Sequence, residues 1–380
     1  MSVLFLMPNW KTPSEVFLQR MLDGLAGNLG CVVSWHTNGE MFWRNEVPAV
    51  SLAMPLWTVA EKILIRLKLS PQEMPVDEVL LRAIRNYRIS KVLCHYAEFA
   101  LRFEKVWEQT DVPVFVHFHG YDATFDLRSH DTPDIPFHRK DYIEQLVRFS
   151  RRATFIANSI FTRDKLIAAG IPRERIILKY LGVPIPQKHT RQQGTSNVTI
   201  LHVGRLVDFK SPDRTIRAFE LACDKGLHAE LVIAGDGPMR ITCELLRVRS
   251  PYRDKIKILG AVDVETVSRL LRKADLFTQH NIKGELSCQE ECFGVSIVEA
   301  MAAGLPVVGT KSGAVSETVV HAETGLLGEP GDVEEQAANF LRLAGDASLR
   351  AKLGAAGRQR VEAHFSVADE HAALRSILDM

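Results

Sequence analysis

The sequence predicts an α/β protein built from two doubly wound, Rossmann-like parallel-sheet domains, and three observations support this. The 380-residue length fits two domains of ordinary size. Short continuous apolar runs alternate with amphipathic stretches along the chain, as expected for strands that helices bury on both faces. The alternation stops once, in a polar segment at 184–197 with two prolines and a glycine, and then restarts.

The elements expected in the first domain follow one another from the N-terminus. Continuous apolar runs indicate strands at 3–7, 31–35, 91–95, 114–118 and 153–156. Amphipathic spacing indicates helices at 15–29, 142–149 and 161–169. We expect this N-terminal domain to span residues 1–184.

The second domain repeats the alternation after the polar segment. Strands are expected at 198–203, 229–234, 256–259, 276–279 and 307–308. Helices are expected at 212–223, 264–273 and 295–303, and then at 334–343, 348–362 and 366–379. We expect this domain to span residues 198–364. Because open parallel sheets bind ligands beyond the carboxyl ends of their strands, two such domains predict a ligand-binding cleft between them.

The composition is that of a folded protein without a strong charge. It is 46% hydrophobic and 24% charged, with a net charge of +1 at pH 7, which argues against disorder and against a general nucleic-acid binder. The first half is mildly basic and the second mildly acidic. This asymmetry is either a chance fluctuation or a sign that the first half meets an anionic surface, such as a membrane.

Cysteine usage and the absence of an apolar run of about 18 residues favour a cytoplasmic protein. The chain has six cysteines, few for its length, and its first residues lack the basic and long apolar regions of a secretory signal. Cys288 and Cys292 are spaced unlike zinc ligands and have no second pair nearby, so we expect no metal there.

Two cations follow the first strand of the second domain. Arg205 comes directly after Gly204, and Lys210 precedes Ser211-Pro212, a cap and first turn typical of a helix start. A forked guanidinium and an ammonium beside a helix N-terminus suit a pyrophosphate. The alternative interpretation is an ordinary solvated loop between a strand and a helix.

Two carboxylates lie around the start of another expected helix. Glu291 precedes Gly294, where the backbone can approach a ligand closely, and Glu299 lies in an otherwise apolar helical run. The free amides of the first turn, from Gly294 to Ser296, would attract an anion. Glu299 faces either solvent or a partner hydroxyl. The alternative interpretation of Glu291 is a carboxylate that only interacts favourably with the helix dipole.

Together these elements resemble the retaining glycosyltransferases of family 4, which have the two-domain GT-B fold. The resemblance rests on Gly204-Arg205 with Lys210, followed by Glu291 and Glu299 eight residues apart. It extends over nearly the whole chain. Further segments that match are 119–122, 157–159, 182–184, 234–238 and 299–308, with Gly313 and Glu317.

The resemblance implies a role for each matching residue. Arg205 and Lys210 would hold the diphosphate of a nucleotide-sugar, most simply a UDP-sugar, and Glu291 would bind the sugar hydroxyls. Glu299 would bind the ribose, and His119 would lie at the anomeric centre. Residues lining the sugar and diphosphate through their backbone would be Phe293, Gly294, Val295 and Ser296. Asp122 is a further substrate-binding candidate, and the tail helix 365–380 would pack back on the N-terminal, acceptor-side domain.

The loop after the first strand departs from the family pattern. Many members carry two glycines there, whereas this chain has residues 8–15, ending in Ser14-Glu15. That ending resembles enzymes of polysaccharide biosynthesis and suggests that Ser14 contacts the acceptor. The basic residues Lys62, Arg66 and Lys68, and a second group at 139–152 with aromatic neighbours, either form solvated faces or contact the cytoplasmic face of a membrane.

The expected reaction is transfer of a sugar to a hydroxyl of a saccharide or a lipid-linked glycan, with retention at the anomeric carbon. The chain has no Asp-x-Asp motif, and Arg205 and Lys210 would replace the metal, so we expect no metal and no cofactor. Two alternatives stay open. One is a nucleotide-sugar epimerase of the same architecture, and the other is a nucleotide-sugar-binding subunit without catalysis.

Overall fold

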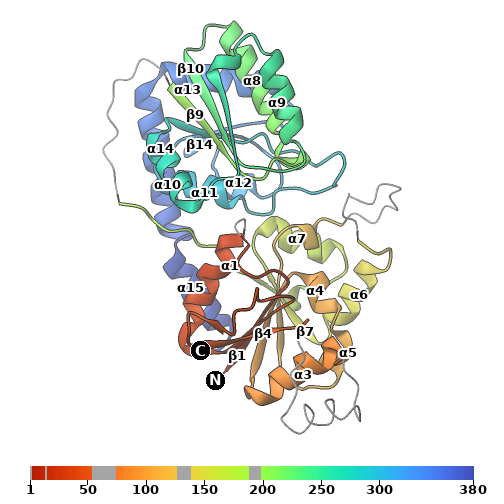
Figure 1. Ribbon diagram of the computed structural model, residues 1–380. Helices are drawn as coiled ribbons and strands as arrows, with labels where there is room; N and C mark the ends of the chain where they lie inside the picture. Colours follow the sequence, from red (N-terminus) through yellow and green to blue (C-terminus); the bar gives the residue numbers. More distant parts are fainter. Residues whose placement is uncertain (1, 13–14, 54–73, 126–137, 188–197) are drawn as a thin grey trace.

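The structure, a computed structural model, describes residues 2–12, 15–53, 74–125, 138–187 and 198–380. It has two lobes, each a twisted sheet with helices on both faces (Figure 1). Most strands are parallel and largely buried on both sides because helices cover both faces, which is why they appear in the sequence as continuous apolar runs.

The N-terminal sheet has the strand order β3-β4-β2-β1-β5-β6-β7-β8 within the described residues. All neighbours pair in parallel except β3 and β4, which are antiparallel at one edge. The strands are β1 (Val3–Met7), β2 (Leu29–Ser34), β3 (Phe42–Trp43), β4 (Val47–Ser51), β5 (Lys91–His95), β6 (Val114–His117), β7 (Ala153–Ala157) and β8 (Ile176–Leu178). The α-helices are α1 (Val16–Leu25), α3 (Val76–Asn86), α4 (Ala97–Leu101), α5 (Glu104–Glu108), α6 (Tyr142–Phe149) and α7 (Ile160–Ala168).

The C-terminal sheet is parallel, with the order β11-β10-β9-β12-β13-β14. Its strands are β9 (Val198–Val203), β10 (Ala229–Ala234), β11 (Ile256–Gly260), β12 (Leu276–Thr278), β13 (Val307–Thr310) and β14 (Gly325–Gly328). Its helices are α8 (Pro212–Asp224), α9 (Arg240–Arg249), α10 (Val264–Lys273), α11 (Val295–Ala302), α12 (Val315–Thr318), α13 (Val333–Gly345) and α14 (Ala347–His364).

The last helix, α15 (Val367–Ile377), returns to the N-terminal domain and packs beside α1 (Figure 1). Lys179 and Glu370 form a fully buried ion pair of 2.6 Å between this domain and α15. Lys91 donates to the carbonyl of Leu378 and pairs with Asp379 at 2.7 Å. These bonds fix the tail to the N-terminal sheet, and one continuous apolar cluster contains side chains from both domains.

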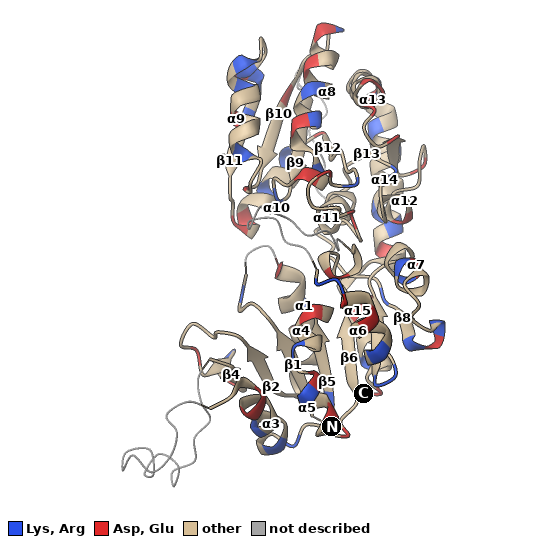
Figure 2. Cartoon of the chain, turned by 90° about the vertical axis from the view of Figure 1, so that its right-hand side faces the viewer, with Lys and Arg blue, Asp and Glu red and all other residues tan. Residues whose placement is uncertain are grey.

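Lys and Arg are interspersed with Asp and Glu over both domains (Figure 2). No described helix is long and apolar enough to cross a membrane. Lys62, Arg66 and Lys68 lie outside the described residues, as do Ser14 and most of the expected linker.

Candidate active site

A cavity of about 480 Å³ lies between the two domains. The N-terminal domain contributes Phe17 and Arg20 of α1 and the loop around His119. The C-terminal domain contributes the loops that follow β9 and β10 and the start of α11. The carboxyl ends of both sheets therefore face one cavity, where a ligand could contact both domains.

The loop after β9 brings both predicted cations to this cavity. Gly204 has φ of +159°, and Arg205 is exposed, with no ion-pair partner in the described part of the chain. Lys210 is nearly buried and forms an ion pair with Glu291. Because Glu291 neutralises Lys210, it is the unpaired guanidinium of Arg205 that gives this part of the cavity wall a local positive charge, although the domain as a whole is mildly acidic.

Glu291 lies at the centre of a polar network at the N-terminal end of α11. Besides Lys210, it accepts hydrogen bonds from the backbone N–H of Gly294 at 3.0 Å and from the Asn281 amide at 3.3 Å. Burial by itself would raise the pKa of Glu291, but the Lys210 and Arg205 cations hold it below its usual value. Glu291 is therefore an ionised acceptor held in one orientation.

Close backbone approach explains the glycines of this site. A Cβ on Gly235, which has φ of +155°, would overlap the carbonyl oxygen of Gly204. A Cβ on Gly313, which has φ of +55°, would overlap the carbonyl oxygen of Glu291. A larger residue at either position would push the loop of residues 204–210, which carries both cations (the cation loop), or the loop around Glu291 out of place, since the overlapped carbonyl oxygens belong to those loops.

Glu299 bridges the two domains. Its Oε1 accepts a hydrogen bond of 2.6 Å from Arg20 of α1, 279 positions earlier in the chain. Both side chains are only partly exposed and line the cavity. Glu299 therefore neither faces open solvent nor lacks a partner, because the Arg20 guanidinium holds it.

His119 belongs to a stack of three histidines at the carboxyl ends of β5 and β6, in which His95 and His117 are fully buried and His119 is half-buried at the cavity. Its Nε2 is 2.9 Å from Nδ1 of His95, and its ring lies 4.4 Å from that of His117 at an angle of 8°. Burial lowers the pKa of all three well below the usual value, so the rings are neutral at pH 7. Neutral His119 can position a hydroxyl by a hydrogen bond.

The three histidines offer nitrogen atoms within 4.8 Å of one another, close enough to suggest a metal site. Imidazole binds a metal in the plane of its ring, however, and the rings of His117 and His119 are stacked nearly parallel. One ion cannot lie in both planes. The arrangement therefore fits a hydrogen-bonded stack of neutral rings better than a centre with three ligands.

Asp122 lies behind the His119 loop and is fully buried. Its carboxylate accepts hydrogen bonds from the backbone N–H groups of His119, Gly120 and Ala97, at 2.9, 3.0 and 3.1 Å. It does not line the cavity. Its place in the structure is that of a residue that shapes the loop carrying His119.

The remaining predicted residues divide between cavity and core. Val295 and Ser296 line the cavity in the first turn of α11, and Gly294 caps that helix with φ of +81°. The Phe293 side chain points into the core, where its ring lies 5.7 Å from that of Phe365. Ser14 lies outside the described residues.

Sequence patterns alone did not single out the contacts between domains. Arg20 reaches Glu299, and Glu317 of α12 accepts from the backbone N–H groups of Ile160 and Phe161, at 2.8 and 2.6 Å. A carboxylate at the N-terminus of α7 is favourable because it meets the positive end of the helix dipole. Arg20 could be recognised in the sequence only as a basic residue on a helix that follows a strand. That position does not identify the carboxylate with which it pairs.

Comparison with known proteins is consistent with this geometry. Residues 187–360 match the family of glycosyl transferases group 1. The amylovoran biosynthesis glycosyltransferase AmsK of Erwinia amylovora is 29% identical over 283 residues, or 74% of this chain and 65% of AmsK. N-acetyl-alpha-D-glucosaminyl L-malate synthase of Bacillus anthracis is 30% identical over 170 residues, or 45% of this chain and 42% of that protein. The chain thus matches less than two thirds of the length of these relatives.

Solved structures show the same fold over the whole chain. Anabaena Alr3699/HepE, solved in complex with UDP, superposes with a TM-score of 0.79 at 20% identity and full coverage of both chains. The sucrose-phosphate synthase of Thermosynechococcus elongatus gives 0.77 at 17% identity, covering 100% of this chain and 98% of that one. The protein therefore has the GT-B fold, and residues 187–360, most of which lie in its C-terminal domain, match the glycosyl transferases group 1.

Proposed function

We propose that this protein is a metal-independent, retaining glycosyltransferase of the family 4 type, which moves a sugar from a nucleotide-sugar to a hydroxyl of a saccharide or lipid-linked glycan. The observation that carries the proposal is the cavity between the domains. It places Arg205, Lys210, Glu291 and Glu299 on one wall and His119 on the other. A UDP-sugar is the favoured donor because Alr3699/HepE, which has the same fold, was solved with UDP.

Each wall has its own task in the proposed reaction. Arg205 and the free amides at the start of α11 stabilise the negative charge that builds on the diphosphate as the sugar–phosphate bond breaks. Lys210 adds charge there and keeps Glu291 ionised, so that Glu291 accepts hydrogen bonds from the sugar hydroxyls. Glu299 binds the ribose after it exchanges its bond with Arg20.

The acceptor hydroxyl approaches from the side of the N-terminal domain. Its oxygen forms a bond to the anomeric carbon on the face from which the phosphate departs, and its proton passes to the departing phosphate oxygen. Neutral His119 orients the reacting groups by a hydrogen bond, since burial disfavours its cationic form. The protein thus needs no carboxylate nucleophile, in contrast to a retaining glycosidase.

A donor panel tests the proposal. Purified protein is mixed with UDP-, GDP- and ADP-sugars, with saccharide acceptors and with or without EDTA, and nucleotide release is measured. We expect release with one donor, unchanged by EDTA and lost in Arg205→Ala. Lys257→Ala, an exposed lysine of the same domain, is the control. Binding without release would favour a silent subunit, and donor isomerisation without transfer would favour an epimerase.

A further inference from the structure

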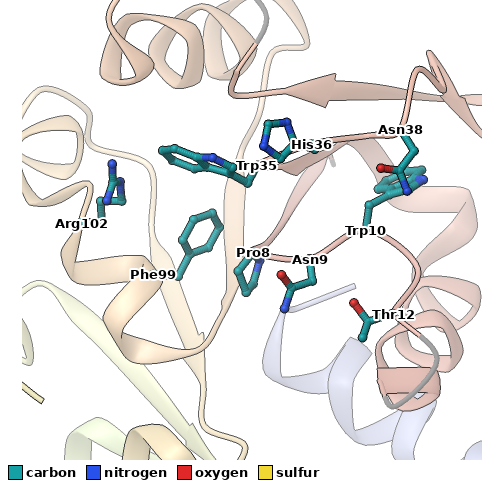
Figure 3. A pocket seen from close by; sticks show the side chains of 9 residues that line it. All are labelled: Pro8, Asn9, Trp10, Thr12, Trp35, His36, Asn38, Phe99 and Arg102. Carbon is teal, nitrogen blue, oxygen red and sulfur yellow. The ribbon is translucent and has the colours of Figure 1, made fainter. Parts of the chain in front are cut away.

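A second cavity, of about 420 Å³, lies on the N-terminal domain and shares no lining residue with the first. It is formed where β1, β2 and β5 end, by the loop after β1, the loop after β2 and helix α4. Figure 3 shows the side chains that line it. Those that carry the argument are Asn9, Trp10, Trp35, Asn38, Phe99 and Arg102.

Aromatic rings form the walls of this cavity. Phe99 is largely buried, and Trp35 is half-buried beside it; Trp10, also largely buried, lies across the cavity near Asn38 (Figure 3). The Trp35 backbone is fixed, because its N–H donates to Pro8 and its carbonyl accepts from Ser51. Rigid ring faces of this kind pack against the C–H faces of pyranose rings and keep their shape without a ligand.

The polar groups of the cavity are free to bind a ligand. The Asn9 and Asn38 amides are exposed and make no hydrogen bond in the described structure. Arg102 lies with its guanidinium carbon 4.5 Å from the centre of the Trp35 ring. No carboxylate of the described residues pairs with it. Amides match sugar hydroxyls, and an unpaired guanidinium held on an aromatic face matches a carboxylate or a phosphate.

The position of the cavity connects it with the proposed active site. The cavity opens at the edge of the sheet where the strands have their carboxyl ends, and His119, which follows β6, lies at the same edge. The strand order there is β2-β1-β5-β6. Neighbouring strands are about 4.8 Å apart, so the two places are roughly 10–15 Å from each other. A glycan of two or three sugar residues spans that length.

We propose that this cavity is a second saccharide subsite, which binds an anionic sugar residue of the acceptor glycan. The anion is the carboxylate of a uronic acid or a phosphate ester, and Arg102 recognises it while Trp35 and Phe99 hold the ring. The proposal rests on the proposed function in that the bound glycan is the acceptor. Binding itself needs no donor, and it can be measured separately.

The experiment uses one oligosaccharide in three forms. Wild-type protein is titrated in the absence of any nucleotide-sugar. The three ligands are cellotetraose, cellotetraose oxidised at C6 to the uronic acid, and cellotetraose phosphorylated at O6. Tryptophan fluorescence and saturation-transfer NMR report binding. We expect an anionic form to bind at least tenfold more tightly than the neutral one, because a charge-assisted hydrogen bond replaces a neutral contact. The tighter of the two anionic forms assigns carboxylate or phosphate.

Variants locate the binding. Arg102→Gln should abolish the preference for the anion but keep the affinity for cellotetraose, whereas Trp35→Leu should weaken all three forms. Arg85→Gln, an exposed arginine of α3, makes the same change in charge and should bind like the wild type. Equal affinity of wild-type protein for charged and neutral forms, or an unchanged preference in Arg102→Gln, would overturn the subsite. Absence of nucleotide release in the donor panel would overturn the proposed function instead, and it leaves these titrations unaffected.

Discussion

Replacing Lys210 by Met should destabilise the protein and reverse the pH dependence of the contribution that Glu291 makes to its stability. Lys210 and Glu291 are each 9% exposed, so the substitution leaves a nearly buried carboxylate without its cation. Breaking such a pair from one side costs about 3–5 kcal/mol. The bonds from Gly294 and Asn281 remain, so we expect the lower end, about 3 kcal/mol.

The contribution of Glu291 to the free energy of unfolding should depend on pH in opposite directions in the wild type and in Lys210→Met. The pKa of Glu291 is lowered in the folded protein, so its stabilising contribution is present above the unfolded value of 4.5 and is lost as the pH falls below it. Without Lys210, burial dominates and raises the pKa. In Lys210→Met the contribution of Glu291 should then fall as the pH rises above 4.5, so the difference in stability between the wild type and Lys210→Met should grow with pH above 4.5.

Urea unfolding of four proteins measures the effect: wild type, Lys210→Met, Glu291→Gln and the double variant. The double variant has no buried charge at this pair and should be more stable than the sum of the single changes predicts, by about 2 kcal/mol. Additive changes within about 0.5 kcal/mol would refute the coupling. Nucleotide release should fall at least a hundredfold in both variants that lack Lys210, if Lys210 stabilises the leaving diphosphate as proposed.

Four further outcomes are expected. Gly235→Ala should lose at least about 2 kcal/mol of unfolding free energy and the binding of UDP, because its Cβ meets the backbone of the cation loop; Gly226→Ala, also at positive φ but with open space around it, should lose only about 1 kcal/mol and keep UDP binding. Arg20→Gln should bind UDP up to about fivefold more tightly in calorimetry, because Glu299 is then free, whereas weaker binding would mean that Arg20 contacts the nucleotide. Burial raises the pKa of Asp122 to about 6, so wild-type stability should decrease by up to about 3 kcal/mol between pH 4 and 6, and Asp122→Asn should lack this decrease in urea unfolding. EDTA should leave nucleotide release unchanged, and loss of release that added Mg²⁺ restores would contradict the metal-free reaction.

The sequence predicted the strands at the centre of each sheet well. The expected strands 3–7, 91–95, 198–203 and 229–234 have the observed bounds, because they are continuous apolar runs buried on both faces. β4 was missed because Pro48 interrupts its run near the sheet edge. α9 was missed because its apolar residues Ile241, Leu245 and Val248 are exposed and only Cys243 is fully buried, so the buried stripe is too short to give a clear helical pattern.

The sequence by itself determined which residues bear charge at the strand ends and helix starts of the C-terminal domain. Arg205, Lys210, Glu291 and Glu299 lie in two short segments, and parallel strands bring their carboxyl ends to one edge. Only the tertiary structure decided their partners. Lys210 meets Glu291 and Arg20 meets Glu299 across separations of 81 and 279 positions, and no periodicity reaches that far. Local patterns record burial and backbone geometry, whereas a buried charge is neutralised by whichever side chain the packed domains bring beside it.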